Sequence, residues 1–247
     1  MILKRFFTLA IAVLFAAPAV MGQSTSSEMS IEESYLQEAI EMMIIRETSR
    51  SDSLDQKMVA LQHIGNAIER GSTNEEIRVT LEYLSLEGTQ NKARMGGRLV
   101  NNHPGVRRQA AKYLGDLGTK EAKDTLLKIC TTDNEPMVLQ EAIKSLGTIG
   151  LNENDDVINT IVWVMNKDTN SEVPDNILAV AAIEAIELLS KQNRSADPNA
   201  IQVITRIMSG PYANPVKQRA RQALVSLGRN AAEQQARQQQ QQQQRQN

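Results

Sequence analysis

The hydrophobic positions of the chain recur with the period of an α-helix over most of its length. Residues 104–118 read PGVRRQAAKYLGDLG, in which Val106, Ala110, Leu114 and Leu117 fall on one side of a helix. A proline in the first turn costs no hydrogen bond, and a glycine after the last turn accepts the left-handed conformation that ends a helix. The segment is therefore predicted to be one short helix with a single buried face.

The same spacing returns further along the chain. Residues 136–150 match the first segment without a gap, and residues 174–189 and 215–228 keep its apolar positions. The repeat period is 32, 40 and 38 residues, which predicts helix pairs stacked into a solenoid. The helices that lie between these segments would carry stripes of their own, at Ala122, Leu126, Leu127 and Ile129, at Val157, Ile158, Ile161, Val162 and Met165, and at Ile201, Ile204 and Met208.

The rest of the chain is less regular. Residues 23–102 are predicted to be diverged helical repeats, with helices near 31–47, 54–70 and 75–86 and a short helix near 92–100. Residues 103–228 hold the clear repeats. Residues 229–247 form a glutamine-rich tail that cannot bury a core and is either disordered or an extension of the last helix. The total is about eleven helices, or five to six pairs, in an all-α fold. Aromatic residues make up only 3% of the chain, which also favours helices over strands.

Residues 1–22 have the layout of a secretory signal peptide. Two basic residues precede an apolar run over residues 6–17, which is short for a membrane span, and a proline and small residues follow. Cleavage before Gln23, or alternatively before Val20, would leave no transmembrane anchor. No cysteine follows the run to carry a lipid. These features predict export to the periplasm or to the medium.

The charge of the remaining chain alternates in blocks. The net charge is −8 for residues 23–91, +6 for 92–132, −9 for 133–187 and +7 for 188–247. Such fields favour association with a partner of complementary charge or with a second copy of the chain. The alternative is a solvated helical surface with chance clustering. Nucleic acid is not expected as a partner, because the acidic blocks would repel it.

Motifs for catalysis, cofactor binding and metal binding are missing from the sequence. With only Cys130 and two histidines, His63 and His103, the chain can form neither a tetrahedral Cys/His zinc site nor an intrachain disulfide. The histidines are interpreted as surface or cap residues, and the cysteine as a small packed residue. Trp163 and Tyr113 are interpreted as core or inter-repeat packing. We therefore expect no catalytic, cofactor-binding or metal-binding residue.

The string P-x-V-R-x-x-A-x-x-L-G-x-L-G resembles the short, bilin-lyase-like variety of the HEAT-repeat family. Residues 104–150 carry this resemblance strongly, residues 174–228 moderately, and residues 30–102 only by helix periodicity. The resemblance implies a right-handed α-solenoid in which the second helix of each pair lines a concave binding surface.

On that resemblance, residues 104–118 form a second helix, and Arg107, Arg108 and Lys112 are the expected contacts with an acidic protein surface. The implied function is a non-enzymatic scaffold of the cell envelope that binds protein partners, including other copies of itself. The alternatives are an assembly factor that holds exported proteins transiently and, less favoured, a bilin-lyase-like enzyme.

HEAT repeats often carry a turn aspartate and a helix arginine that link successive repeats into a ladder. In this chain the corresponding positions pair Asn101 with Arg107 and Asp133 with Leu139, while Ala179 and Lys217 stand at the other arginine positions. The ladder is therefore expected to be broken, so that stacking rests on the apolar stripes.

Overall fold

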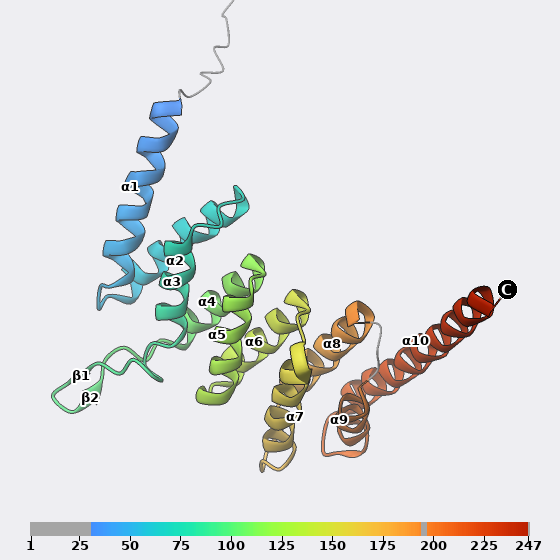
Figure 1. Ribbon diagram of the computed structural model, residues 1–247. Helices are drawn as coiled ribbons and strands as arrows, with labels where there is room; N and C mark the ends of the chain where they lie inside the picture. The colour runs from blue at the N-terminus through green and yellow to red at the C-terminus, as the bar shows by residue number, and fades with distance from the viewer. Residues whose placement is uncertain (1–30, 194–196, 247) are drawn as a thin grey trace, which may run out of the picture.

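The computed structural model describes residues 31–193 and 197–246, so the predicted signal peptide lies outside the described residues. In these residues ten α-helices follow one another and pack as sequential pairs, which is the architecture of an α-solenoid (Figure 1). The predicted all-α solenoid is confirmed, with five pairs. The helices are α1 (Ile31–Ser49), α2 (Leu54–Glu69), α3 (Glu75–Ser85), α4 (Pro104–Leu117), α5 (Lys120–Thr132), α6 (Pro136–Ile149), α7 (Asp156–Thr169), α8 (Asn176–Asn193), α9 (Pro198–Ser209) and α10 (Asn214–Gln246).

The helix pairs form two layers. The first helices of the pairs, α1, α3, α5, α7 and α9, lie in one layer, and the second helices, α2, α4, α6, α8 and α10, lie in the other. In Figure 1 the pairs follow one another from the blue end of the molecule to the red end. All loops that lead from a first helix to its second helix therefore lie along one edge of the solenoid, which we call the front edge.

The predicted apolar stripes form the core between the layers. Val106, Ala110 and Leu114 of α4 are completely buried, and so are their equivalents in α6. The stripe of α9 differs from the prediction, because Ile201 is 38% exposed while Ile204 is buried. The buried face of α9 runs instead through Ala200, Val203, Ile204 and Ile207.

Glycines let the second helices approach one another closely. A Cβ atom on Gly147 of α6 would lie 2.6 Å from the Cα atom of Ala185 in α8, and Gly115 of α4 faces Ser145 of α6 in the same way. At the equivalent position of α8 the chain has Glu187, which pairs with Arg219 of α10. Close backbone contact thus joins the central second helices, whereas an ion pair joins the last two.

The prediction of a helix near residues 92–100 is wrong. These residues form a hairpin of two short antiparallel strands, β1 (Arg94–Met95) and β2 (Arg98–Leu99), which extends from the front edge between α3 and α4 (Figure 1). Gly96 and Gly97 form its tip with φ angles of 57° and 83°. Two successive glycines with positive φ match the tight turn that a hairpin requires, and this signal outweighs the helical period.

The glutamine-rich residues continue the last helix, since α10 extends to Gln246. Of the two alternatives for the tail, the extension of the last helix is the one that the structure has.

We expect Gly147→Ala to lower the free energy of unfolding by about 1 to 3 kcal/mol, because the new methyl group would overlap with the backbone of α8. The matched control is Gly228→Ala in α10, where an added Cβ atom meets nothing within 4 Å. That change should raise the free energy of unfolding by up to about 1 kcal/mol, through helix propensity. Urea unfolding followed by circular dichroism measures both, and equal effects would contradict the close packing of α6 on α8.

Candidate functional site

Side chains from the first turns of the second helices link each pair to the front-edge loop of the next pair. We call each such contact between neighbouring pairs a joint and number the joints from the N-terminus. At the first joint, Lys57 of α2 pairs with Glu87, and both side chains are at most 3% exposed. A buried ion pair therefore links the first two repeats at a position for which the sequence analysis made no prediction.

The second joint is held by Arg107 of α4. Its Nε donates to Asp133 Oδ2 over 2.6 Å, and its Nη1 donates to Asn102 Oδ1 over 2.8 Å. Arg107 and Asp133 are each 2% exposed. The sequence expectation paired Asn101 with Arg107, but the arginine contacts the aspartate of the following repeat instead. Arg107 also cannot serve as the surface contact expected for it, because its guanidinium is buried in this joint.

The third joint, between α6 and α8, lacks the ion pair. The repeat register places Leu139 where the second joint has Arg107, and Val173 where it has Asp133. A weaker link replaces the ion pair: Gln140 Nε2 lies 3.3 Å from both carboxylate oxygens of Asp175. Leucine has neither the length nor the polar head of arginine, so the space between the two loops is left open.

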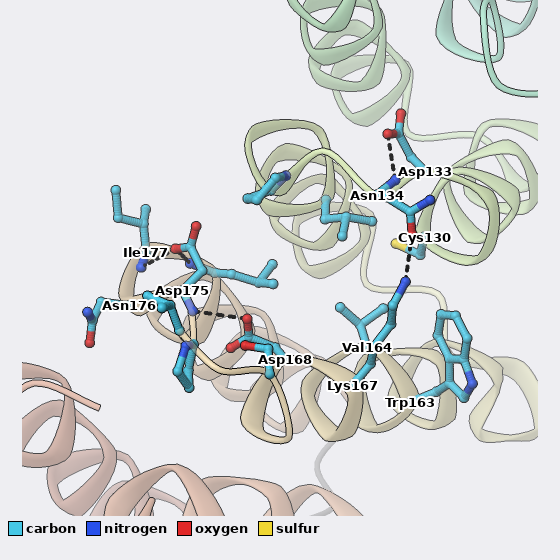
Figure 2. Close-up of a pocket in the computed structure, with 16 residues that line it drawn as sticks. Cys130, Asp133, Asn134, Trp163, Val164, Lys167, Asp168, Asp175, Asn176 and Ile177 are labelled. Carbon is cyan, nitrogen blue, oxygen red and sulfur yellow. Dashed lines mark hydrogen bonds between the residues drawn. The ribbon is translucent and has the colours of Figure 1, made fainter. Parts of the chain in front are cut away.

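A groove of about 550 Å³ occupies this third joint. Its floor and walls come from the end of α5, the start of α6, the end of α7 and the loop to α8, as Figure 2 shows. Most of its lining is apolar, including Trp163, Val173 and Ile177, which are 48%, 85% and 67% exposed. The apolar lining residues are Cys130, Pro136, Leu139, Trp163, Val164, Val173, Pro174, Ile177 and Leu178.

Two carboxylates in the groove, Asp168 and Asp175, form hydrogen bonds only with neutral donors among the described residues. Asp168 accepts from the Asp175 backbone N–H over 2.9 Å and from the Tyr212 hydroxyl over 2.8 Å. Asp175 accepts from the N–H groups of Ile177 and Leu178 and so caps α8. The structure gives neither carboxylate a cation in salt-bridge contact. The groove therefore combines an apolar lining with two carboxylates that form no salt bridge with another described residue.

A single cation, Lys167, lies among the described lining residues. Its Nζ donates to Asn134 Oδ1 over 2.6 Å and lies 5.8 Å from the centre of the Trp163 ring. Of the interpretation of Trp163 as core or inter-repeat packing, the first half is wrong, because the side chain is exposed and lines the groove. Tyr113 does pack between repeats, since its ring covers Gly65 of α2.

The fourth joint is filled by Tyr212, which is 4% exposed. Its hydroxyl reaches back to Asp168 and to Thr169 Oγ1, each over 2.8 Å. Burial raises the pKa of this hydroxyl above its ordinary value. The carboxylate of Asp168 thus lies between a joint that is filled and one that is open.

The other two predicted contact residues lie on the surface of α4. Arg108 is 54% exposed beside Glu141 at 3.6 Å, and Lys112 is 49% exposed beside Asp116 at 3.0 Å. The structure does not bring them together with the groove, so their contact with a partner stays a prediction. The groove itself was missed, although Leu139 at an arginine position and the longer period of 40 residues are visible in the sequence.

Three further features of the described residues bear on the site. No three histidine, cysteine or carboxylate side chains in residues 31–193 and 197–246 gather to hold a metal ion. No helix described by the structure combines the length and apolar character needed to cross a membrane. Cys130 is 1% exposed, as expected of a packed residue, and His103 lies at the N-cap of α4.

We expect Arg107→Ala to lower the free energy of unfolding by about 3 to 5 kcal/mol, because the change leaves the buried Asp133 carboxylate without its cation. Arg108→Ala is the matched control at the neighbouring position. Its exposed ion pair should be worth at most about 1 kcal/mol. Thermal or urea unfolding of both variants measures the difference, and similar losses would mean that the second joint does not depend on its ion pair.

We expect the Cys130 thiol to react slowly with iodoacetamide in the folded protein. Burial raises its pKa from 9.0 to about 12, and the thiolate is the reactive form. Between those two pH values the folded chain keeps a proton that the unfolded chain has lost, so this group lowers the free energy of unfolding as the pH rises. The measurement is the labelling rate at pH 9 with and without urea. Equal rates would contradict the burial of the thiol.

The comparisons with known proteins agree with this geometry. No curated protein matches the chain. A family model described as HEAT repeats matches residues 98–182, which include α4, α5, α6 and α7, the beginning of α8 and most of the groove. Residues 98–182 therefore belong to the HEAT-repeat family.

Proposed function

We propose that the chain is a non-enzymatic, protein-binding scaffold whose groove at the third joint holds a segment with a cationic side chain beside an apolar one. HEAT repeats commonly bind proteins, which supports the general class. The observation that supports the specific site is the replacement of the buried pair Arg107 and Asp133 by Leu139 and Val173 at the same positions of the repeat register. At the second joint the chain itself supplies the side chains that fill the space. At the third joint a bound ligand would supply them.

The second joint indicates which chemistry fits such a space. Arg107 places its methylene groups against the core and its guanidinium between a carboxylate and an amide oxygen. A cation entering the third joint would find Asp168 and Asp175, and an aliphatic or aromatic side chain would cover Leu139 and Trp163. Arginine suits this role better than lysine, because its planar group is more weakly hydrated and stacks on aromatic rings.

Binding rather than catalysis is supported by how the groove uses its polar groups. Asp175 holds the first N–H groups of α8, and Asp168 holds the loop that precedes it. Both carboxylates are therefore held in place as structural acceptors, from which they can attract a cationic side chain.

Export belongs to the same proposal. The basic and apolar pattern of residues 1–22 supports a signal peptide, so we place the scaffold in the periplasm or outside the cell, as part of an envelope complex. The assembly-factor alternative would use the same groove with faster exchange of its ligand.

The test is selection from a random-peptide display library on the immobilised protein. We expect enriched peptides to carry arginine or lysine next to a large apolar residue, and Asp168→Asn to weaken their binding about tenfold or more. The asparagine removes the charge, while its Oδ1 can still accept from the Asp175 N–H and its Nδ2 can donate to the Tyr212 hydroxyl. Glu172→Gln is the matched control, because it removes one charge from the same loop outside the groove lining. Enrichment without this motif, or equal effects of the two variants, would refute the proposed site.

A further inference from the structure

The hairpin at the front edge is an ordered arm whose exposed cations form no ion pair with the other residues that the structure describes. Residues 88–103 contain Lys92, Arg94 and Arg98 and no carboxylate. None of the three cations lies in an ion pair with another described residue, and Arg94 only returns to the Gly97 carbonyl at 3.1 Å. Between the two arginines, Met95 is 72% exposed. Two strands of two residues bury no core, so stability does not account for the arm.

The base of the arm is firmly fixed. The Asn101 side chain is 5% exposed and bridges the two sides of the hairpin, accepting from Ala93 N–H over 2.9 Å and donating to the Asn91 carbonyl over 2.7 Å. Gly88 is required at the turn, because an added Cβ atom would lie 2.6 Å from the Asn101 carbonyl oxygen. The cations are therefore presented in a set direction, which lowers the entropy cost of binding.

The arm and the groove are chemically complementary. The arm offers an exposed methionine between two unpaired arginines, and methionine adapts well to irregular apolar surfaces. The groove offers an apolar lining with Trp163, together with the carboxylates Asp168 and Asp175 that have no cation. At the level of the sequence, the arm belongs to the block of net charge +6 and the groove to the block of −9.

Both features lie on the front edge of the same molecule. The arm is the loop from α3 to α4, and the groove is formed by the loops from α5 to α6 and from α7 to α8. Two copies can place their front edges against each other with their chains running antiparallel. A single two-fold axis then brings the arm of each copy to the groove of the other. A two-fold interface satisfies both contacts at once, and each contact strengthens the other.

We propose that the partner held in the groove is the hairpin of a second copy, and that two such contacts form a two-fold symmetric dimer. Met95 of each copy enters the apolar part of the groove, and Arg98, which pairs with Met95 across the hairpin and shares its face, lies against the carboxylates. This proposal rests on the groove being a protein-binding site, as proposed above, and it names the segment that the groove binds.

The test uses the full chain and two variants of opposite charge. The arm variant is Arg94→Glu with Arg98→Glu, and the groove variant is Val173→Lys with Ile177→Lys, at positions exposed enough to leave the fold intact. Sedimentation velocity should find a dimer for the wild-type chain at low salt. Each variant alone should raise the dissociation constant more than about tenfold. Mixing the two variants should restore the dimer, because a negative arm then meets a positive groove and the unchanged arm meets the unchanged groove.

The control is Arg221→Glu with Arg229→Glu, which reverses two exposed cations on α10 far along the chain from the arm. It should leave the dimer unchanged. A monomeric wild-type chain at all concentrations, or no recovery on mixing, would overturn the dimer. If the groove still selects cationic and apolar peptides in an Asp168-dependent way, only the dimer fails and the proposed function stands. If peptide selection fails as well, the groove is not a binding site.

Discussion

The space between neighbouring loops of a helical stack has to be filled, because protein interiors tolerate few gaps and buried polar groups need partners. Along the front edge of this molecule the joints fill this space in different ways. Lys57 and Arg107 fill the first two joints with buried ion pairs, and Tyr212 fills the fourth. At the third joint Leu139 is too short to fill the space, which remains as the groove. The position of the candidate site follows from this single difference.

The buried ion pairs fix the arrangement of the repeats more than they increase their stability. Removing two charges from water costs several kcal/mol, and their attraction returns this only with good geometry and further hydrogen bonds. Arg107 has these, from Asp133, Asn102 and the Glu87 carbonyl. Replacing the pair by Leu139 and Val173 avoids the desolvation cost, so the third joint can stay open without weakening the stack greatly. A binding groove at the third joint therefore lowers the stability of the fold only slightly.

Helices and their buried faces could be predicted from the sequence because they depend on local spacing. The proline and glycine at the ends of residues 104–118 locate α4 within one residue, and Val106 and Leu114 are buried as the period requires. The prediction of a helix over residues 92–100 is wrong because Gly96 and Gly97 count there only as weak helix formers, whereas together they carry a turn signal that outweighs the helical period.

The joints were harder to predict, because they connect residues of different repeats. Arg107 contacts Asp133, which lies 26 positions further along the chain. An alignment of single repeats instead pairs the arginine with Asn101 of its own repeat. Exposure of Trp163 also depends on the third joint, since a filled joint would have covered it. The groove could have been inferred only by asking what replaces Arg107 in the next repeat.

The placement of the arm and the groove decides which assembly can form. A donor at one end of a solenoid and an acceptor at the other would join copies head to tail, and such contacts propagate into filaments unless the ring closes. Here both lie on one edge, so a single two-fold axis uses both contacts of both copies and leaves no arm or groove free. The acidic α1 and the basic α10 then remain outside the interface. Repeat proteins often collect their insertions on the binding face, and the hairpin and the long loop before α8 follow that rule on the front edge.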